Sequence, residues 1–420
     1  MKSYLQRLEE TPAPGRWPLA RGWMETEPLP FYAELRRHRP VLVLPEVTLV
    51  TRHADCTEVL HRYDLFSVGH YAPKQGDYWM AQDDTPEHWR DKAVMRAVLD
   101  REHIPEIRAW VGAEAARRLR EAGGEAPFEA VAGLTRAVPL ALVQHWFGFE
   151  GSDADELFTW SYWNQMDAFW NQPFHQGAYG DPDAIVAARE AANARMREYL
   201  VGLVTRRAGE LRAGAGGSDV VSRLLRLAAS EALRFDTGAV VLNTGGLLIG
   251  AVETTSHCVV NAIEVLLADP ERRAAATAAA RSDDPAAIDG HVFEALRLRP
   301  AFAYAFRIAT ADTVLARGSD HAVRVPAGTT VLAVTHSAMF DEAAVAEPAV
   351  FDPTRPLAQT FTFGLGLHEC LGRAIGAVMV PAMVREALRL EGLSVGPVDR
   401  GGGPVPERWD WRWDRRWSEA

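Results

Sequence analysis

Most of this chain shows the hydrophobic spacing of α-helices, in which apolar residues return every three or four positions. The longest such pattern covers residues 238–267 and carries few charges on any face, so we expect that helix to run through the core. A cap residue followed by proline and an acid at residues 84–88 predicts the start of another helix. Further helices are predicted over residues 54–61, 109–122, 127–146, 184–212 and 371–390.

Short runs of β-branched and aromatic residues predict a few strands beside these helices. The runs at residues 41–44 and 47–51 flank a Pro-Glu turn, and the runs at residues 323–326 and 329–334 flank a glycine turn. Each of these two pairs is therefore expected to form a hairpin. The fold class is therefore mainly α with a small β-rich subdomain, whose parts lie near residues 41–52, 301–334 and 393–415. The runs are residues 41–44, 47–51, 301–306, 323–326, 329–334 and 409–413.

Proline and glycine mark the expected irregular segments. Residues 1–40 are Pro-rich and are predicted to be irregular up to a short helix at residues 30–38, and residues 64–82 are predicted to be a loop. Pro381 should kink the last helix or split it in two. The Gly-rich stretch at residues 213–218 separates two helical regions, and we still expect one domain over residues 1–420.

Composition adds an ordinary globular background and excludes some partners. The 420 residues are 48% hydrophobic and 24% charged, and their net charge of −11 disfavours nucleic acid. The three cysteines are odd in number and scattered, which argues for a reducing compartment. Residues 1–20 hold no apolar run and no stretch approaches the roughly 20 apolar residues of a bilayer span, so we expect a soluble cytoplasmic protein without membrane association.

One cysteine lies in a chemically distinctive loop. Cys370 sits among glycines in residues 363–372, directly before the last predicted helix. A thiolate needs positive potential and N–H donors, which a helix N-terminus provides, and glycines let the backbone pass close to a flat ligand. The pattern predicts a single metal ligand presented on a loop. The alternative is a buried, inert thiol.

The motif F-G-x-G-x-H-x-C-x-G in residues 363–372 resembles the haem-binding loop of the cytochrome P450 family. The resemblance implies the cytochrome P450 fold around a haem b, with Cys370 as the iron ligand and His368 serving a propionate. Covalent haem attachment is not expected, because the chain has no C-x-x-C-H motif. The loop residues expected to hold the cofactor are Phe363, Gly364, His368, Cys370 and Gly372.

The long apolar helix contains a second motif, residues 250–255, that breaks local rules. Glycine costs about 1 kcal/mol in a helix interior, and a buried charged Glu253 costs more unless it is paired. The segment resembles the (A/G)-G-x-(D/E)-T-(T/S) motif of the same family. By that resemblance Gly250 leaves room for dioxygen, Thr254 bonds the carbonyl of Gly250, and Glu253 with Thr254 delivers protons for O–O cleavage. The alternative is an acid–threonine pair on a solvated helix.

Further cofactor contacts follow from the resemblance alone. Arg307 stands where the family has a propionate-binding arginine. His88 and Lys92 share a helix face and would reach the propionates, although the family usually has Arg at the second position and lysine lacks the bidentate fork. The alternative for this pair is a solvated basic face at residues 89–92.

A Glu–Arg pair is expected to have a structural role. Glu294 and Arg297 lie on one helix face and match the buried E-x-x-R pair of the family, which holds the proximal side of the haem. The third partner in that arrangement is usually arginine, and Val350 stands there in this chain. Arg355 is the candidate substitute.

The substrate pocket is the least specific prediction. Residues 158–174 are rich in aromatic rings, which in the family lie above the substrate but are as often core packing. If these rings line the pocket, a flat or aromatic substrate is favoured. The candidate pocket residues are Tyr78, Trp79, Trp163, Phe169, Trp170, Leu247, Phe302 and Tyr304.

The resemblance implies a bacterial-type monooxygenase that inserts one atom of dioxygen into a small organic substrate, such as a natural product. The chain has neither a dinucleotide G-x-G-x-x-G motif after a strand nor a ferredoxin cysteine cluster, so electrons are expected from a separate ferredoxin and NAD(P)H-dependent reductase. Alternatives on the same haem are oxidative coupling, rearrangement and peroxide-driven oxidation, the last disfavoured by Glu253-Thr254. A non-enzymatic alternative is a haem sensor or electron carrier.

Overall fold

The computed structural model describes residues 2–99, 101–124 and 126–414, so residue 415 of the predicted β-rich part at 393–415 lies outside the described chain. The chain divides into two compact units. The first comprises Met1–Thr85 and Arg297–Cys370, and the second comprises Pro86–Leu296 and Leu371–Ala420. The single domain predicted over residues 1–420 stays a prediction.

The first unit is built on a five-stranded sheet with strand order β1-β2-β8-β5-β3. The predicted N-terminal hairpin is confirmed, because β1 and β2 pair antiparallel with Leu42 opposite Leu49. Strand β8 runs parallel to β2 and antiparallel to β5, and a buried apolar cluster that includes Val50, Phe66 and Val331 forms the core of this unit. The strands are β1 Val41–Val43, β2 Thr48–Val50, β3 Phe66–Ser67, β5 Ala305–Ala309 and β8 Thr330–Ala333.

The second predicted hairpin is wrong. Strand β7, Val323–Val325, pairs antiparallel with β6, Thr313–Leu315, in a separate two-stranded sheet, whereas β8 joins the large sheet. The run predicted over 301–306 becomes a strand only at Ala305, within β5. Periodicity identified the runs 323–326 and 329–334 as strands, but it carries no information about which strand each one pairs with.

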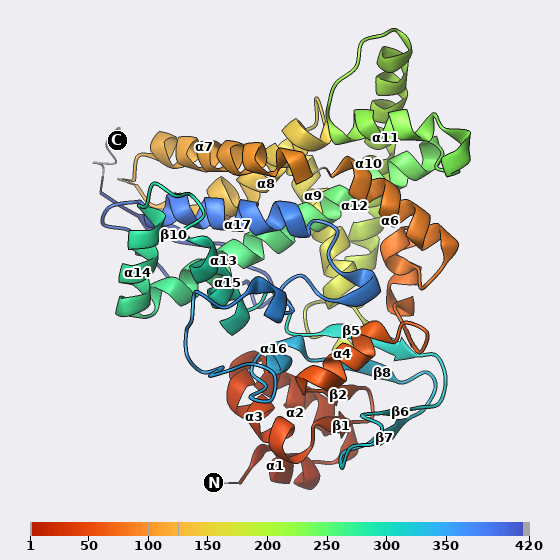
Figure 1. Ribbon diagram of the computed structural model, residues 1–420, viewed down its shortest axis with the longest axis vertical. Coiled ribbons are helices and arrows are strands. Elements are labelled where there is room, and N and C mark those ends of the chain that lie inside the picture. The colour runs from red at the N-terminus through yellow and green to blue at the C-terminus, as the bar shows by residue number, and fades with distance from the viewer. Residues whose placement is uncertain (1, 100, 125, 415–420) are drawn as a thin grey trace. The chain divides into compact units, whose positions relative to one another are not determined.

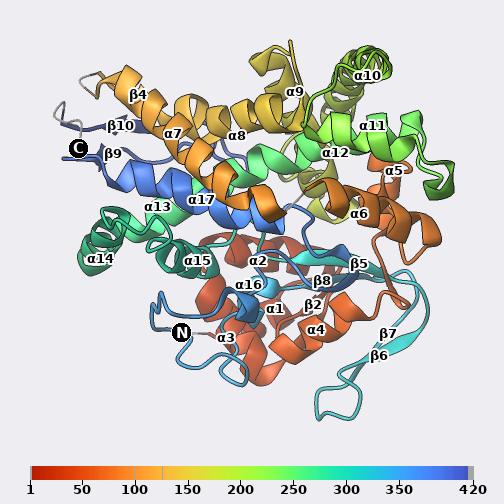
Figure 2. The same ribbon diagram turned by 45° about the horizontal axis from the view of Figure 1, so that its top comes forward.

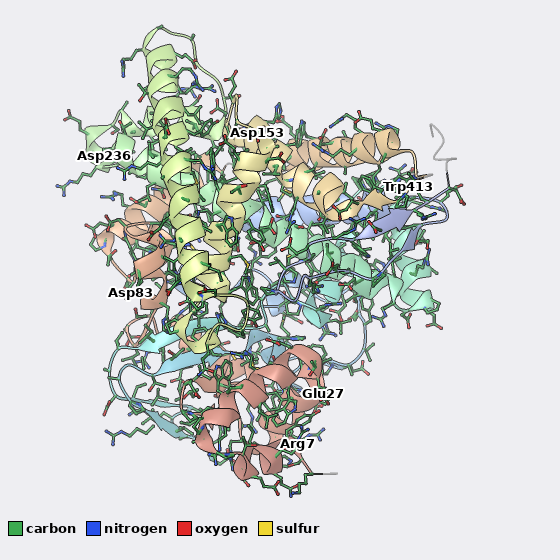
Figure 3. All side chains as sticks on the ribbon, turned by 180° about the vertical axis from the view of Figure 1, so that it is seen from behind. Arg7, Glu27, Asp83, Asp153, Asp236 and Trp413 are labelled. Carbon is green, nitrogen blue, oxygen red and sulfur yellow. The ribbon has the colours of Figure 1, made fainter. Side chains whose placement is uncertain are left out.

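The prediction that residues 1–40 are mainly irregular is also wrong, because three helices occupy most of them. Pro14 and Pro28 fall at the first positions of α2 and α3. The N–H groups of a first helical turn have no intrahelical partner, so proline loses nothing there. Arg7, labelled in Figure 3, stacks 4.6 Å from the ring centre of Trp23. The helices are α1 Tyr4–Glu10, α2 Ala13–Thr26 and α3 Pro28–His38.

The rest of the first unit consists of short helices and turns around the sheet (Figure 1). The segment predicted as a loop at 64–82 contains β3 and three short helical turns. Asp83, labelled in Figure 3, fixes the end of that segment by accepting bonds from the Ser67 hydroxyl and the Val68 N–H. The helical elements are α4 His53–His61, η1 Gly69–Tyr71, α5 Ala72–Gln75, η2 Trp79–Ala81, α16 Thr335–Ala338, η9 Leu357–Gln359 and η10 Gly366–His368.

The second unit is mainly helical. Helices α7, Ile104–Ala122, and α17, Arg373–Leu388, lie side by side in both ribbon views (Figures 1 and 2). Asp153 and Asp236, labelled in Figure 3, cap the N-termini of α9 and α12 with their carboxylates. The other helices are α6 Pro86–Val98, η3 Arg101–His103, η4 Val131–Arg136, α8 Ala137–Leu142, η5 Val143–Phe147, α9 Ala154–Gln165, η6 Met166–Trp170, η7 Pro173–His175, α10 Pro182–Arg212, α11 Val220–Ala228, η8 Glu231–Leu233, α12 Thr237–Ala251, α13 Glu253–Leu267, α14 Pro270–Ala280 and α15 Asp289–Leu298, which continues into the first unit.

The helix predictions for this unit are confirmed apart from details of their interruptions. Helix α17 is not split, and Pro381 lies inside it. The long apolar pattern at 238–267 is interrupted, with α12 ending at Ala251 and α13 starting at Glu253. By length and composition the stretch Thr237–Leu267 would pass for a membrane span, and 67% of its most apolar window is buried inside the protein.

A small sheet lies near the C-terminal end of the chain. Strand β10, Asp410–Arg412, confirms the predicted terminal strand and pairs antiparallel with β4, Phe128–Glu129, and β9, Ser394–Val395. Strand β4 was not predicted, because it consists of two residues at the edge of a helical pattern. Trp411 is fully buried in this sheet.

Candidate active site

The cysteine loop of the first unit leaves Cys370 exposed and is held by backbone hydrogen bonds. The Cys370 N–H donates to the Phe363 carbonyl at 2.8 Å, and the Gly364 N–H donates to the Phe361 carbonyl at 2.8 Å. Cys370 is exposed, so the alternative of a buried, inert thiol is wrong for this residue. It applies instead to Cys56, which is fully buried and whose thiol pKa is raised by burial.

Two glycines give the loop its shape. Gly364 and Gly366 have φ values of 69° and 76°, in the left-handed region that side chains rarely adopt. A Cβ on Gly366 would lie 2.5 Å from the backbone oxygen of Leu60 in α4, so the loop packs directly on that helix. The remaining predicted glycine, Gly372, is the N-cap of α17.

Arg307 is a buried cation in the first unit. It lies in β5, is 6% exposed, and donates from Nη1 to the Phe306 carbonyl at 2.8 Å. Burial lowers the pKa of its guanidinium, and Tyr71 and Asp83 oppose this weakly. None of the ion pairs among the described residues includes Arg307, and a buried guanidinium is strongly stabilised by a neighbouring anion.

These observations test whether a haem would fit this chain. An exposed thiol on a glycine loop suits an iron ligand, and a buried guanidinium without a carboxylate partner suits a propionate. Within residues 2–99, 101–124 and 126–414, no three His, Cys, Asp or Glu side chains gather as a metal site. A thiolate-bound haem needs only one protein ligand, so the residues present fit this group.

Tyr78 lies within electrostatic range of Cys370, in the same unit. Burial raises the pKa of its phenol, and the neighbouring Cys370 raises it further. Tyr78 is 8% exposed and belongs to the same unit as the cysteine loop. Tyr78 is thus a predicted pocket residue whose phenol is influenced electrostatically by the predicted metal ligand.

In the second unit the interrupted helix has the expected open position. Val252, between α12 and α13, has φ −89° and ψ −71°. Gly250 is exposed, and a Cβ placed on it would meet no other atom within 4 Å. The helix surface at this glycine is therefore open.

Glu253 is buried in an ion-pair network. It is 2% exposed, so the alternative of a solvated acid is wrong. The guanidinium of Arg136 donates to its two carboxylate oxygens at 2.9 and 3.0 Å, and also to Glu407 at 3.2 Å. Tyr162 donates to Glu407 at 2.9 Å, and Arg136 stacks 4.6 Å from the ring centre of Phe158. Burial raises the pKa of Glu253, and the two-point contact with Arg136 opposes that rise.

Thr254 has a different partner from the one predicted. Its hydroxyl oxygen accepts a bond from Nε2 of Gln165 at 2.9 Å, and no bond to the Gly250 carbonyl is formed. Two residues further along the helix, Ser256 pairs with Thr135 at 2.7 Å. Glu253 and Thr254 therefore contact different elements, η4 and α9.

The predicted propionate residues of α6 are buried. His88 is 0% and Lys92 is 2% exposed, so a solvated basic face is the wrong description of both. Their neighbour Trp89 is 48% exposed, and Arg90 pairs with Asp91 at 2.7 Å. His368, in η10 of the first unit, is partly buried. What these residues bind stays a prediction.

The predicted Glu–Arg pair is buried in α15, with Glu294 2% and Arg297 0% exposed. Arg297 donates to the carbonyl oxygens of Met339 and Val350 and stacks 4.6 Å from the ring centre of Phe340. The backbone of Val350 thus contacts Arg297 although its side chain is not arginine. Arg355 donates to the Ala346 carbonyl.

The other predicted pocket residues are divided between packing and partial exposure. Trp163 and Trp170 pack on a buried cluster of Met166, Ile185 and Val405, which favours core packing for these two rings. Trp79 is 0% and Leu247 is 7% exposed. Trp163 and Trp170 are themselves partly exposed, as are Phe169, Phe302 and Tyr304.

Sequence reasoning missed three residues around the acid–threonine pair. Arg136 stands alone as a charge within the apolar pattern 131–143, and an unpaired charge in such a pattern is a usable signal. Gln165 is a polar residue in the aromatic segment, a weaker signal. Glu407 lies in an irregular segment and gave none.

Comparison with known proteins gives consistent matches. The family model described as Cytochrome P450 matches residues 287–390. The Nocardicin C N-oxygenase of Nocardia uniformis subsp. tsuyamanensis is 31% identical over 369 residues, covering 82% of this chain and 83% of that protein. A steroid C26-monooxygenase of Mycobacterium tuberculosis is 26% identical, covering 78% and 82%. The solved structure of the open cytochrome P450 Eryk from S. erythraea has a TM-score of 0.76 and 25% identity, covering 94% and 98%.

Proposed function

Because this chain belongs to the cytochrome P450 family, it is a haem b oxidoreductase of the monooxygenase type, and we propose that it inserts one atom of dioxygen into a small organic substrate. The fold is that of bacterial members of the family. One relative is named for the N-oxygenation of nocardicin C, and natural-product tailoring is the class of reaction we propose for this chain.

We assign the cofactor contacts as follows. Cys370 supplies the thiolate for the haem iron, and Arg307 holds a propionate, for which its burial without a carboxylate partner is the support. When bound, the thiolate-ligated haem activates dioxygen for transfer of one oxygen atom to the substrate. His88, Lys92 and His368 are further propionate donors, and Phe363, Gly364 and Gly372 shape the loop.

Glu253 and Thr254 handle the protons that this chemistry consumes. Thr254 presents a hydroxyl, and the adjacent Glu253 is an acid whose pKa is raised by burial, which favours its protonated, proton-donating form. Arg136 holds the carboxylate of Glu253 in place, and Gly250 leaves the helix surface open.

Partners follow from the class of reaction. The enzyme needs an organic substrate, dioxygen and a source of electrons, and we propose a separate ferredoxin with an NAD(P)H-dependent reductase as that source. The acidic net charge of −11 favours neither nucleic acid nor anionic membranes as a partner. We propose the cytoplasm as its location, since the three cysteines are scattered along the chain.

The exposed thiol of Cys370 on its glycine loop is the observation that carries this function. The test is the absorption spectrum of the purified, dithionite-reduced protein under carbon monoxide. Wild type and a Cys258→Ala control should show the red-shifted Soret band of thiolate-bound haem, and Cys370→Ser should not. An unshifted band in wild type would refute the proposal. With that band present, a substrate library screened for a spin-state shift of the ferric haem would identify the substrate class.

A further inference from the structure

One side chain of α9 joins the two ends of the interrupted helix. Gln165 is the last residue of α9 and is 3% exposed. Its Nε2 donates one bond to the Thr254 hydroxyl oxygen at 2.9 Å and one to the Ile249 carbonyl at 2.7 Å. Ile249 belongs to the last turn of α12 and Thr254 to the first turn of α13.

The chemistry of the carboxamide fixes the direction of both bonds. Nε2 carries two N–H donors and no acceptor, so both contacts run from Gln165 to the helix. The carbonyls of a last helical turn have no intrahelical partner, and Gln165 supplies a donor for that of Ile249. Because the oxygen of Thr254 already accepts a bond here, its own O–H must point to another acceptor.

We propose that Gln165 is a positioning residue that sets the direction of the Thr254 hydroxyl. With an amide donor on one side, the hydroxyl is left to donate on the other side, as a proton-delivering group must. Gln165 also links α9 and the aromatic rings next to it to the break in the helix, so a displacement of α9 by substrate would reach Thr254. This inference rests on the proposed monooxygenase function.

The sharpest perturbation reverses the polarity of the contact without changing its shape. Gln165→Glu replaces the donor with an acceptor when ionised, so the Thr254 hydroxyl would turn toward it. Gln165→Met removes the donor and keeps the side-chain length. The matched control is Asn164→Asp, since Asn164 is also buried but donates to the Trp160 carbonyl and to Asn193, not to the interrupted helix.

The first measurement is the share of NADH electrons released as hydrogen peroxide by the reconstituted holoenzyme. Gln165→Glu and Gln165→Met should raise that share at least ~5-fold, corresponding to about 1 kcal/mol of lost positioning. The share for Gln165→Glu should fall again as the pH is lowered, since a protonated carboxyl regains a donor, while that for Gln165→Met should stay constant. Wild-type peroxide release and pH profile in both variants would overturn the proposal.

The second measurement does not depend on turnover. The measurement is a double-mutant cycle by urea unfolding of the holoprotein, with Gln165→Met, Thr254→Val and the double variant. The change in the unfolding equilibrium constant of the double variant should be at least ~5-fold smaller than the product of the two single changes, because both substitutions remove the same hydrogen bond. Independent, multiplicative effects would overturn the contact. A wild-type protein without the thiolate spectrum would instead refute the proposed function, whichever way this cycle came out.

Discussion

Replacing Arg136 by methionine gives the most quantitative test of the site. The guanidinium makes a two-point contact with Glu253 and is itself buried, with its side chain 8% exposed against 2% for Glu253. Methionine keeps most of the length and apolar contact of arginine but leaves Glu253 without its counter-ion. Removing one partner of a buried pair destabilises proteins by about 3–5 kcal/mol.

The loss has an upper limit, because Glu253 can escape by taking up a proton. Holding a carboxyl of ordinary pKa ~4.3 neutral at pH 7 costs about 4 kcal/mol, at about 1.4 kcal/mol per pH unit. In Arg136→Met the folded-state pKa of Glu253 lies above its unfolded value, so folded protein keeps a proton that unfolded protein releases. Stability must therefore fall as pH rises through this window.

The assay is urea unfolding followed by far-UV circular dichroism between pH 5.5 and 8.5. We expect Arg136→Met to lose about 3–4 kcal/mol at pH 7, and the loss to shrink by about 1.4 kcal/mol per pH unit toward acid. The control, Arg136→Met combined with Glu253→Gln, should abolish that slope. Glu407 has a 33% exposed side chain and can hydrate, so it should contribute little. A loss below about 1 kcal/mol, or one independent of pH, would refute the reasoning.

Three further outcomes are expected. Gly366→Ala should destabilise the cysteine loop by about 1–3 kcal/mol and reduce haem content, because the φ of Gly366 is 76° and an added Cβ would meet the Leu60 oxygen. The control is Gly402→Ala, which has a similar φ of 75° but no atom within 4 Å of the added Cβ, and it should keep normal haem content. Burial lowers the pKa of His336 to about 4 in the folded protein. As pH falls from 6.5 to 4, His336 takes up a proton in the unfolded protein but not in the folded one, so about 3 kcal/mol of stability is lost. The His336→Gln variant should lack this loss when its stability is measured against pH. Thr254→Ala should divert electrons from product to peroxide, and wild-type coupling in that variant would show that Thr254 delivers no protons.

Local features of the chain were predictable from sequence because each is specified within a few residues. The glycine spacing around Cys370 predicted a loop presenting one ligand, and in the structure Gly364 and Gly366 give that loop its left-handed backbone. The N-terminal hairpin closes over a Pro-Glu turn in the same way, and α10 follows from an unbroken helical period over its 31 residues. The proline content of residues 1–40 gave a wrong prediction, because the effect of proline depends on its position within a helix, which composition does not show.

Tertiary structure decided everything that joins distant segments. Strand β7 pairs with β6 and not with β8. The carboxylate of Glu253 accepts hydrogen bonds from Arg136, which is 117 residues away in the chain. The Thr254 hydroxyl accepts a bond from Gln165, 89 residues away, and makes none to its own helix. Periodicity tells which face of an element is buried, but a buried polar group is satisfied by whichever donor or acceptor the packed helices bring to it. Sequence alone thus indicated the residues proposed to carry the chemistry, and the packing of α9 and η4 against the interrupted helix determined how Glu253 and Thr254 are held.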